Sequence, residues 1–143
     1  NAIPATAEIT FDIRSRQNDT MDEMIEKLGN AIEHGAAAMG ATGRLEVIGG
    51  VPAAEYDDEM TQLASEAIVE VLGQEGLMGE IITPGGDDFH FFAKEKPGLK
   101  TGYLGLGCDL TPGLHDPKMT FDKNALIKGA EILMVLAEKA LAK

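Results

Sequence analysis

The stretch GGDDFHFFAKEKPGLKTGYLGLGCDLTPGLHDPKMTF, residues 85–121, decides the fold and function expected of this chain. It combines glycines, acids and histidines more densely than any other part of the sequence. Gly-rich turns flank a short aromatic segment, and His115 lies in a loop bounded by Pro112 and Pro117. Loops held between regular elements are where binding and catalytic residues concentrate. We therefore expect functional residues in this stretch and beside it.

Strand and helix patterns alternate on both sides of this stretch. Apolar and polar residues alternate from about residue 6 to 14, which is typical of a half-buried strand. Further strands are predicted at residues 45–47, 80–83 and 100–106. Helical spacing of apolar residues predicts helices over residues 21–39, 60–71 and 126–140, with caps at Thr20, Asp57 or Asp58, and Asp122.

This order of elements predicts an α/β fold. Residues 1–51 form a strand–helix–strand unit in this interpretation, which is less than a whole domain. Residues 52–143 form a second α/β segment with the final helix at its end. We therefore expect two lobes with separate cores.

Composition excludes several classes of protein. Hydrophobic residues make up 44% of the 143 residues, which indicates a packed core rather than disorder. The net charge of -12 argues against a nucleic-acid partner, since phosphate binding needs clustered Lys and Arg. No apolar run approaches the ~20 residues of a membrane span. The single cysteine, Cys108, excludes an internal disulfide and favours a reducing compartment, the cytoplasm.

Several motifs in a fixed order carry a family resemblance. They are NAIPATAEITFDIRS at residues 1–15, GGDDF at 85–89, LGLG at 104–107 and LHDPKMTFDKNAL at 114–126. Together they resemble the C-terminal part of a metal-dependent peptidase family. That family includes the aminoacylases, the indoleacetyl-amino acid amidohydrolases and the bacterial glutamate carboxypeptidases.

The resemblance implies a domain organisation. In the family a small lid domain interrupts a larger catalytic domain. Residues 1–51 resemble the second half of the lid, and residues 52–143 resemble the closing segment of the catalytic domain. The resemblance thus implies a longer parent protein. Its N-terminal part would supply further metal ligands and a general-base Glu.

His115 is the candidate metal ligand. Imidazole suits zinc and similar metals, and the resemblance assigns this loop histidine to a site for two metals, zinc or alternatively manganese or cobalt. The alternative is an ordinary surface histidine. One histidine makes no site, because a catalytic zinc needs about three protein ligands. The resemblance therefore implies a metal site that is incomplete in this chain.

Arg14, Asn1, Gly85 and Gly86 are the candidate substrate-binding residues. A guanidinium binds a carboxylate through two parallel hydrogen bonds, so Arg14 could hold a substrate carboxylate. The alternative is a solvent-facing Arg paired with Asp12 or Asp19. The resemblance places Asn1 near the scissile carbonyl, unless Asn1 and Ala2 derive from a tag. Gly85 and Gly86 form either a wall of the site or simply a turn.

Two functions remain in competition. The first is amide hydrolysis of N-acyl amino acids or small peptides by the longer parent, with this chain alone inactive. The second is a non-catalytic α/β module that self-associates or binds a peptide through an open sheet edge. A loose cation-binding role for an acidic protein is the least favoured. An open edge also predicts a homo-oligomer.

Overall fold

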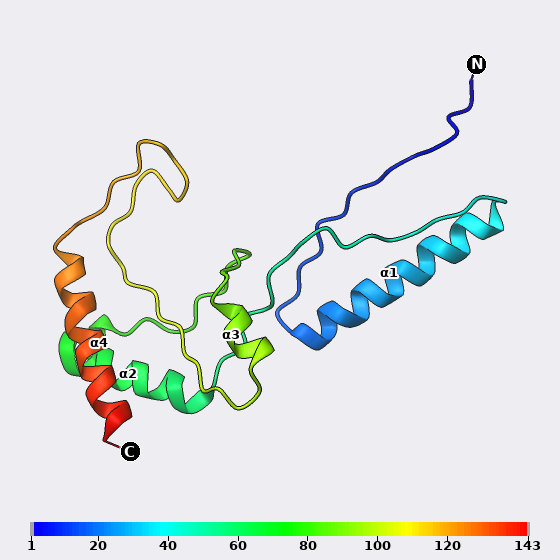
Figure 1. Ribbon diagram of the computed structural model, residues 1–143. Coiled ribbons are helices and arrows are strands. Elements are labelled where there is room, and N and C mark those ends of the chain that lie inside the picture. Colours follow the sequence, from blue (N-terminus) through cyan, green and yellow to red (C-terminus); the bar gives the residue numbers. More distant parts are fainter. Residues whose placement is uncertain (1, 143) are drawn as a thin grey trace. The chain divides into compact units, whose positions relative to one another are not determined.

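The structure is a computed structural model that describes residues 2–142. Along the chain it contains α1 (Asn18–Ala38), α2 (Asp58–Leu72), α3 (His90–Glu95) and α4 (Ala125–Leu141), as Figure 1 shows. The short 3-10 helix η1 (Gln74–Gly76) follows α2. The chain divides into two compact units. Unit 1 comprises the residues up to Glu55 together with Pro84–Lys94, and unit 2 comprises Tyr56–Thr83 together with the residues from Glu95 onward.

The predicted α/β fold is wrong. Within residues 2–142, the only β pairing is one isolated antiparallel bridge between Thr111 and Thr120. The segments at residues 6–14, 45–47, 80–83 and 100–106 form no strands, and no sheet is present in the described part of the chain. The helices carry the regular structure.

The correction has a physical reason. An alternating pattern indicates which side chains would be buried if the segment formed a strand. A strand also needs a neighbouring backbone to pair with its N–H and C=O groups. Within residues 2–142, no backbone hydrogen bonds pair the segment at residues 6–14 with another segment. Its apolar side chains accordingly stay in contact with solvent, with Ile9 74% and Phe11 49% exposed. Alternation alone therefore overstated the β content.

Unit 1 is built around α1. The helix begins at Asn18, two residues before the predicted cap, and a turn at Gly40 with φ 72° sends the chain back along it. Figure 1 shows this return beside the helix, and on it Gly43 lies against Ile32 and Ala36 of α1. A Cβ atom at Gly43 would lie 2.8 Å from the backbone oxygen of Ile32, so the return passes too close for a side chain.

Gly43→Ala is expected to lower the free energy of unfolding by about 1–3 kcal/mol, because the added methyl group overpacks the contact with α1. Gly35→Ala is the control within α1 itself, where no atom other than the neighbouring residues and the backbone of the same helix lies within 4 Å of the new Cβ. That change should stabilise by about 0.5–1 kcal/mol, as Ala is the better helix former. Urea unfolding of both variants measures the difference, and equal stability of the two would contradict this packing.

Unit 2 is built around two helices, α2 and α4, which pack side by side (Figure 1). Asp57 caps α2 by accepting a hydrogen bond from the N–H of Met60 at 3.1 Å, and Gly73 ends it with φ 79°, so this helix and its ends are confirmed. The buried apolar residues of the described chain lie at this contact; they are Leu63, Ala64 and Ala67 of α2 and Ile132 of α4. No helix in residues 2–142 is long and apolar enough to cross a membrane.

Candidate functional site

Arg14 lies at the end of the extended segment before α1, and its guanidinium is held within unit 1. Nε and Nη2 donate to the two carboxylate oxygens of Asp12 at 3.0 and 2.8 Å, and Nη1 donates to the carbonyl oxygen of Pro84 at 2.5 Å. The hydrogen bond from Arg14 and its positive charge lower the pKa of Asp12, and the same contacts raise the pKa of Arg14. Both groups therefore stay charged at neutral pH.

The contacts of Arg14 leave part of its guanidinium for another anion. A guanidinium carries five N–H donors in one plane. Asp12 and Pro84 use three of them, and within residues 2–142 the other two, one on each Nη, have no partner. A carboxylate accepts two such bonds side by side. The pairing with Asp12 that we considered as an alternative is thus observed, and it is compatible with binding of a second carboxylate.

Gly85 and Gly86 directly follow Pro84, so the contact of Arg14 with Pro84 places the glycine turn beside Arg14 in unit 1. A Cβ atom at Gly86 would lie 2.1 Å from Cγ2 of Val51, which no real side chain could do. Any residue other than glycine at position 86 would therefore require the side chain of Val51 to shift. The structure therefore brings together Arg14 and the glycine turn, two sequence-predicted features about seventy residues apart in the chain.

His115 lies in a closed loop of unit 2. Two backbone hydrogen bonds of 2.9 and 2.8 Å between Thr111 and Thr120 close the loop, and the N–H of Asp122 donates to the carbonyl oxygen of Cys108 at 2.8 Å just outside it. His115 is exposed and has φ 66°, in the left-handed region. Non-glycine residues seldom adopt this conformation, although His does so more readily than most, and such residues cluster at functional sites.

The described residues do not form a metal site by themselves. Within residues 2–142, no group of three His, Cys, Asp or Glu side chains gathers in a way that could hold a metal ion. Within these residues His115 belongs to no such group of three. Cys108 is a half-buried free thiol. His115 belongs to unit 2, whereas Arg14, Gly85 and Gly86 belong to unit 1. The described part of the chain therefore does not supply a complete metal site.

Two further points concern the predicted residues. Asn1 lies outside the described residues, so its predicted role stays a prediction. The sequence interpretation missed the carbonyl of Pro84, because a backbone acceptor leaves no mark in a sequence. It also missed Asn18, whose side chain bonds residues Ala53 and Glu55 far along the chain.

Comparison with known proteins adds the family. The family model described as Peptidase family M20/M25/M40 matches residues 7–139. The chain belongs to peptidase family M20/M25/M40. The resemblance drawn from the motifs is therefore confirmed. No solved structure matches this chain significantly.

Relatives of this M20/M25/M40 chain include three bacterial proteins. A candidate glutamate–cysteine ligase 2-3 of Rhodococcus jostii strain RHA1 is 29% identical over 95% of this chain and 17% of the relative. The N-acetylcysteine deacetylase of Bacillus subtilis strain 168 is 28% identical over 96% of this chain and 35% of the relative. A p-aminobenzoyl-glutamate hydrolase subunit homolog of Haemophilus influenzae is 24% identical over 99% of this chain and 34% of the relative. The chain thus spans about a third or less of these relatives.

Proposed function

We propose that this chain is part of a longer amidohydrolase that cleaves the amide bond of N-acyl amino acids or small peptides. Membership of family M20/M25/M40 supports a hydrolytic reaction. Two relatives are named for N-acetylcysteine and p-aminobenzoyl-glutamate, which are both acyl groups joined to an amino acid. The observation that carries the proposal is the guanidinium of Arg14 with two donors left over, because such substrates end in a free carboxylate.

Each candidate residue has a role in this proposal. Arg14 binds the substrate carboxylate through its two remaining N–H groups, and Asp12 and Pro84 hold it in one orientation. Gly85 and Gly86 form the wall beside the bound carboxylate, where the lack of side chains lets a ligand approach the backbone. Asn1 is assigned to the region of the scissile carbonyl.

His115 is proposed as one ligand of a two-metal site, with zinc, manganese or cobalt as the metal. The fixed loop around it and its left-handed backbone support this role. The other ligands and the general-base Glu would come from parts of the longer protein outside this sequence. The described residues of this chain do not supply enough ligands to hold a metal ion by themselves.

The 143-residue chain alone should show no turnover of N-acyl amino acids in the presence of zinc, manganese or cobalt. It should also bind zinc weakly, since the described residues offer no cluster of ligands. Product release assayed by chromatography and zinc titration by calorimetry test both points. Turnover by the chain that both a chelator and His115→Ala abolish would contradict the expectation. Failure of the longer protein to hydrolyse any N-acyl amino acid would overturn the proposed function itself.

Other functions are less well supported. A ligase activity rests on one relative of which the chain spans 17%, against about a third of each of the two hydrolytic relatives. A non-catalytic module that self-associates or binds a peptide would have the same exposed apolar side chains. The longer protein would then show no turnover of N-acyl amino acids. The exposed Ile9 and Phe11 support a homo-oligomer, and the free thiol of Cys108 is compatible with a cytoplasmic location.

A further inference from the structure

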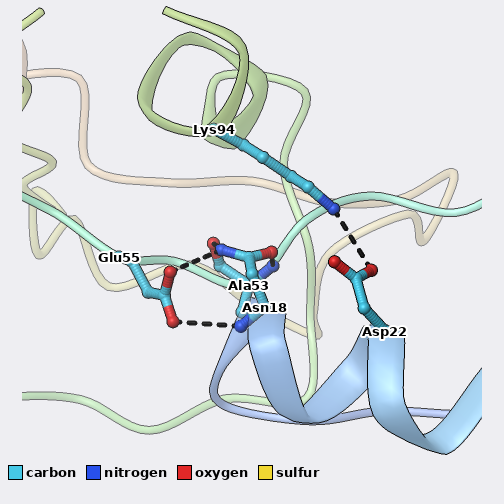
Figure 2. Close-up of polar contacts among 5 residues, drawn as sticks. All are labelled: Asn18, Asp22, Ala53, Glu55 and Lys94. Carbon is cyan, nitrogen blue, oxygen red and sulfur yellow. Dashed lines mark hydrogen bonds and ion pairs between the residues drawn. The ribbon is translucent and has the colours of Figure 1, made fainter. Parts of the chain in front are cut away.

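Asn18, the first residue of α1, is a buried polar residue with partners on a distant segment. It is 9% exposed. Its Oδ1 accepts a hydrogen bond from the N–H of Ala53 at 2.9 Å, and its Nδ2 donates to Oε2 of Glu55 at 2.7 Å and to the carbonyl of Ala53 at 3.4 Å. The backbone N–H of Asn18 donates to Oε1 of Glu55 at 3.0 Å. Figure 2 shows Glu55 bonded to Asn18 through both carboxylate oxygens.

Two other side-chain contacts reach the same part of unit 1. Arg14 donates to the carbonyl of Pro84, as described above. Lys94 forms an ion pair with Asp22 of α1, with Nζ 3.5 Å from Oδ1, and Figure 2 shows this pair beside the Asn18 contacts. Residues 14–22, here called the anchor segment, thus bond Glu55, Pro84 and Lys94.

Those three partners hold a special position in the chain. The polypeptide passes between the two units three times: after Glu55, before Pro84 and after Lys94. Each of these residues is therefore the last or first residue of unit 1 at one connection. All three connections are fastened at their unit 1 end, and all three to the same nine-residue segment.

We propose that residues 14–22 are the common anchor of the three connections, a conformational device that confines movement between the units to the bonds just beyond Glu55, Pro84 and Lys94. Hinges are formed by a few residues that absorb changes in φ and ψ. A hinge works at a defined place only where the chain on one side of it is held. Asn18 and Asp22 are one helical turn apart, so one rigid turn of α1 carries two of the attachments.

The three attachments differ in strength, and Asn18 should dominate. The ion pair of Lys94 with Asp22 is solvent-exposed, and such pairs contribute little. The guanidinium of Arg14 is exposed as well. The amide of Asn18 is buried, so loss of one of its partners leaves a polar group without a hydrogen bond, which is far more costly. Loss of the hydrogen bonds of Asn18 should therefore also weaken the contacts of the anchor segment with Pro84 and Lys94.

Native-state amide hydrogen exchange of the 143-residue chain tests the proposal, with Asn18→Asp as the variant. This change places a carboxylate against the carboxylate of Glu55. Exchange at Ala53, whose N–H donates to Asn18, should become faster on the order of ten- to a hundred-fold. Exchange at Phe92, whose N–H donates to Phe89 between the other two connections, should also rise, though less. Asn30→Asp, the same change at an exposed position of α1, should alter neither.

A double variant distinguishes loss of the anchor contacts from a general loss of stability. Asn18→Asp combined with Glu55→Gln restores a donor facing an acceptor, so it should return exchange at Ala53 and Phe92 most of the way to the original rates. This comparison holds even if Asn18→Asp alone fails to fold. Unchanged exchange at Ala53 would overturn the proposal. Faster exchange at Ala53 with no change at Phe92 would reduce it to a local contact, and so would also overturn the common anchor.

Discussion

Arg14→Ala in the longer protein is expected to lower kcat/KM for N-acyl amino acids by about thirty- to a thousand-fold, because a charge-assisted contact to the substrate carboxylate is lost. Arg14→Lys should lose less than alanine but still a substantial part, since an ammonium cannot make two parallel hydrogen bonds. Metal content should not change in either variant. Steady-state kinetics together with metal analysis of the purified proteins measure these effects.

The decisive control for Arg14 is a substrate whose carboxylate is amidated. The original enzyme should use it poorly, and Arg14→Ala should add little further loss. Asp12→Asn is the matched variant, because it keeps the size of the side chain that orients the guanidinium but weakens its hold on Nε and Nη2. It should raise KM more than it lowers kcat. An equal penalty for Arg14→Ala on the acid and the amide would refute the carboxylate-binding role.

Ile132→Ala should lower the free energy of unfolding by about 2–5 kcal/mol, the usual cost of a cavity in a packed core. Ile132 is 2% exposed and is the largest fully buried side chain of the described chain, at the contact of α4 with α2. Because so few large residues are buried there, the contact has no reserve of apolar area to compensate. Urea unfolding followed by circular dichroism gives the measurement.

Leu133→Ala is the control for this core variant, because Leu133 neighbours Ile132 on α4 but is 56% exposed. It should change the stability by no more than about 0.5 kcal/mol. If the two alanine variants lose the same stability, the packing of α2 against α4 does not hold unit 2 together.

The helices could be predicted from the sequence, and the rest of the fold could not. Asp57 and Gly73 mark the ends of α2 by local chemistry, since a carboxylate caps the first turn and glycine adopts the positive φ beyond the last. For α1 the predicted cap at Thr20 was wrong, because the helix begins earlier, at Asn18, after an N-cap at Gln17. The side chain of Asn18 bonds partners that are distant in the sequence. The predicted strands were wrong because strand pairing depends on which segment lies alongside in space, and the sequence does not give this. The division at residues 51 and 52 stays a prediction.

Within the candidate site, side-chain chemistry was easier to foresee than backbone placement. The exposed polar face of the first segment and the GG pair pointed to Arg14, Gly85 and Gly86 separately. That Arg14 contacts Pro84, directly before the glycines, follows only from the tertiary structure. The family match confirms the resemblance, while the roles of Arg14, Gly85, Gly86 and His115 remain proposals for the experiments described.

The discontinuity of unit 1 sets an order of events during synthesis. Glu55 leaves the ribosome well before Lys94, yet Pro84–Lys94 belongs to the same compact unit as α1. At about 5–20 residues per second, the intervening chain takes roughly 2–8 s to make. Throughout that interval Asp22 lacks Lys94, and for most of it Arg14 lacks Pro84, while Asn18 can already bind Glu55. The nascent chain should thus acquire its attachments one at a time, with the Asn18 contact formed first.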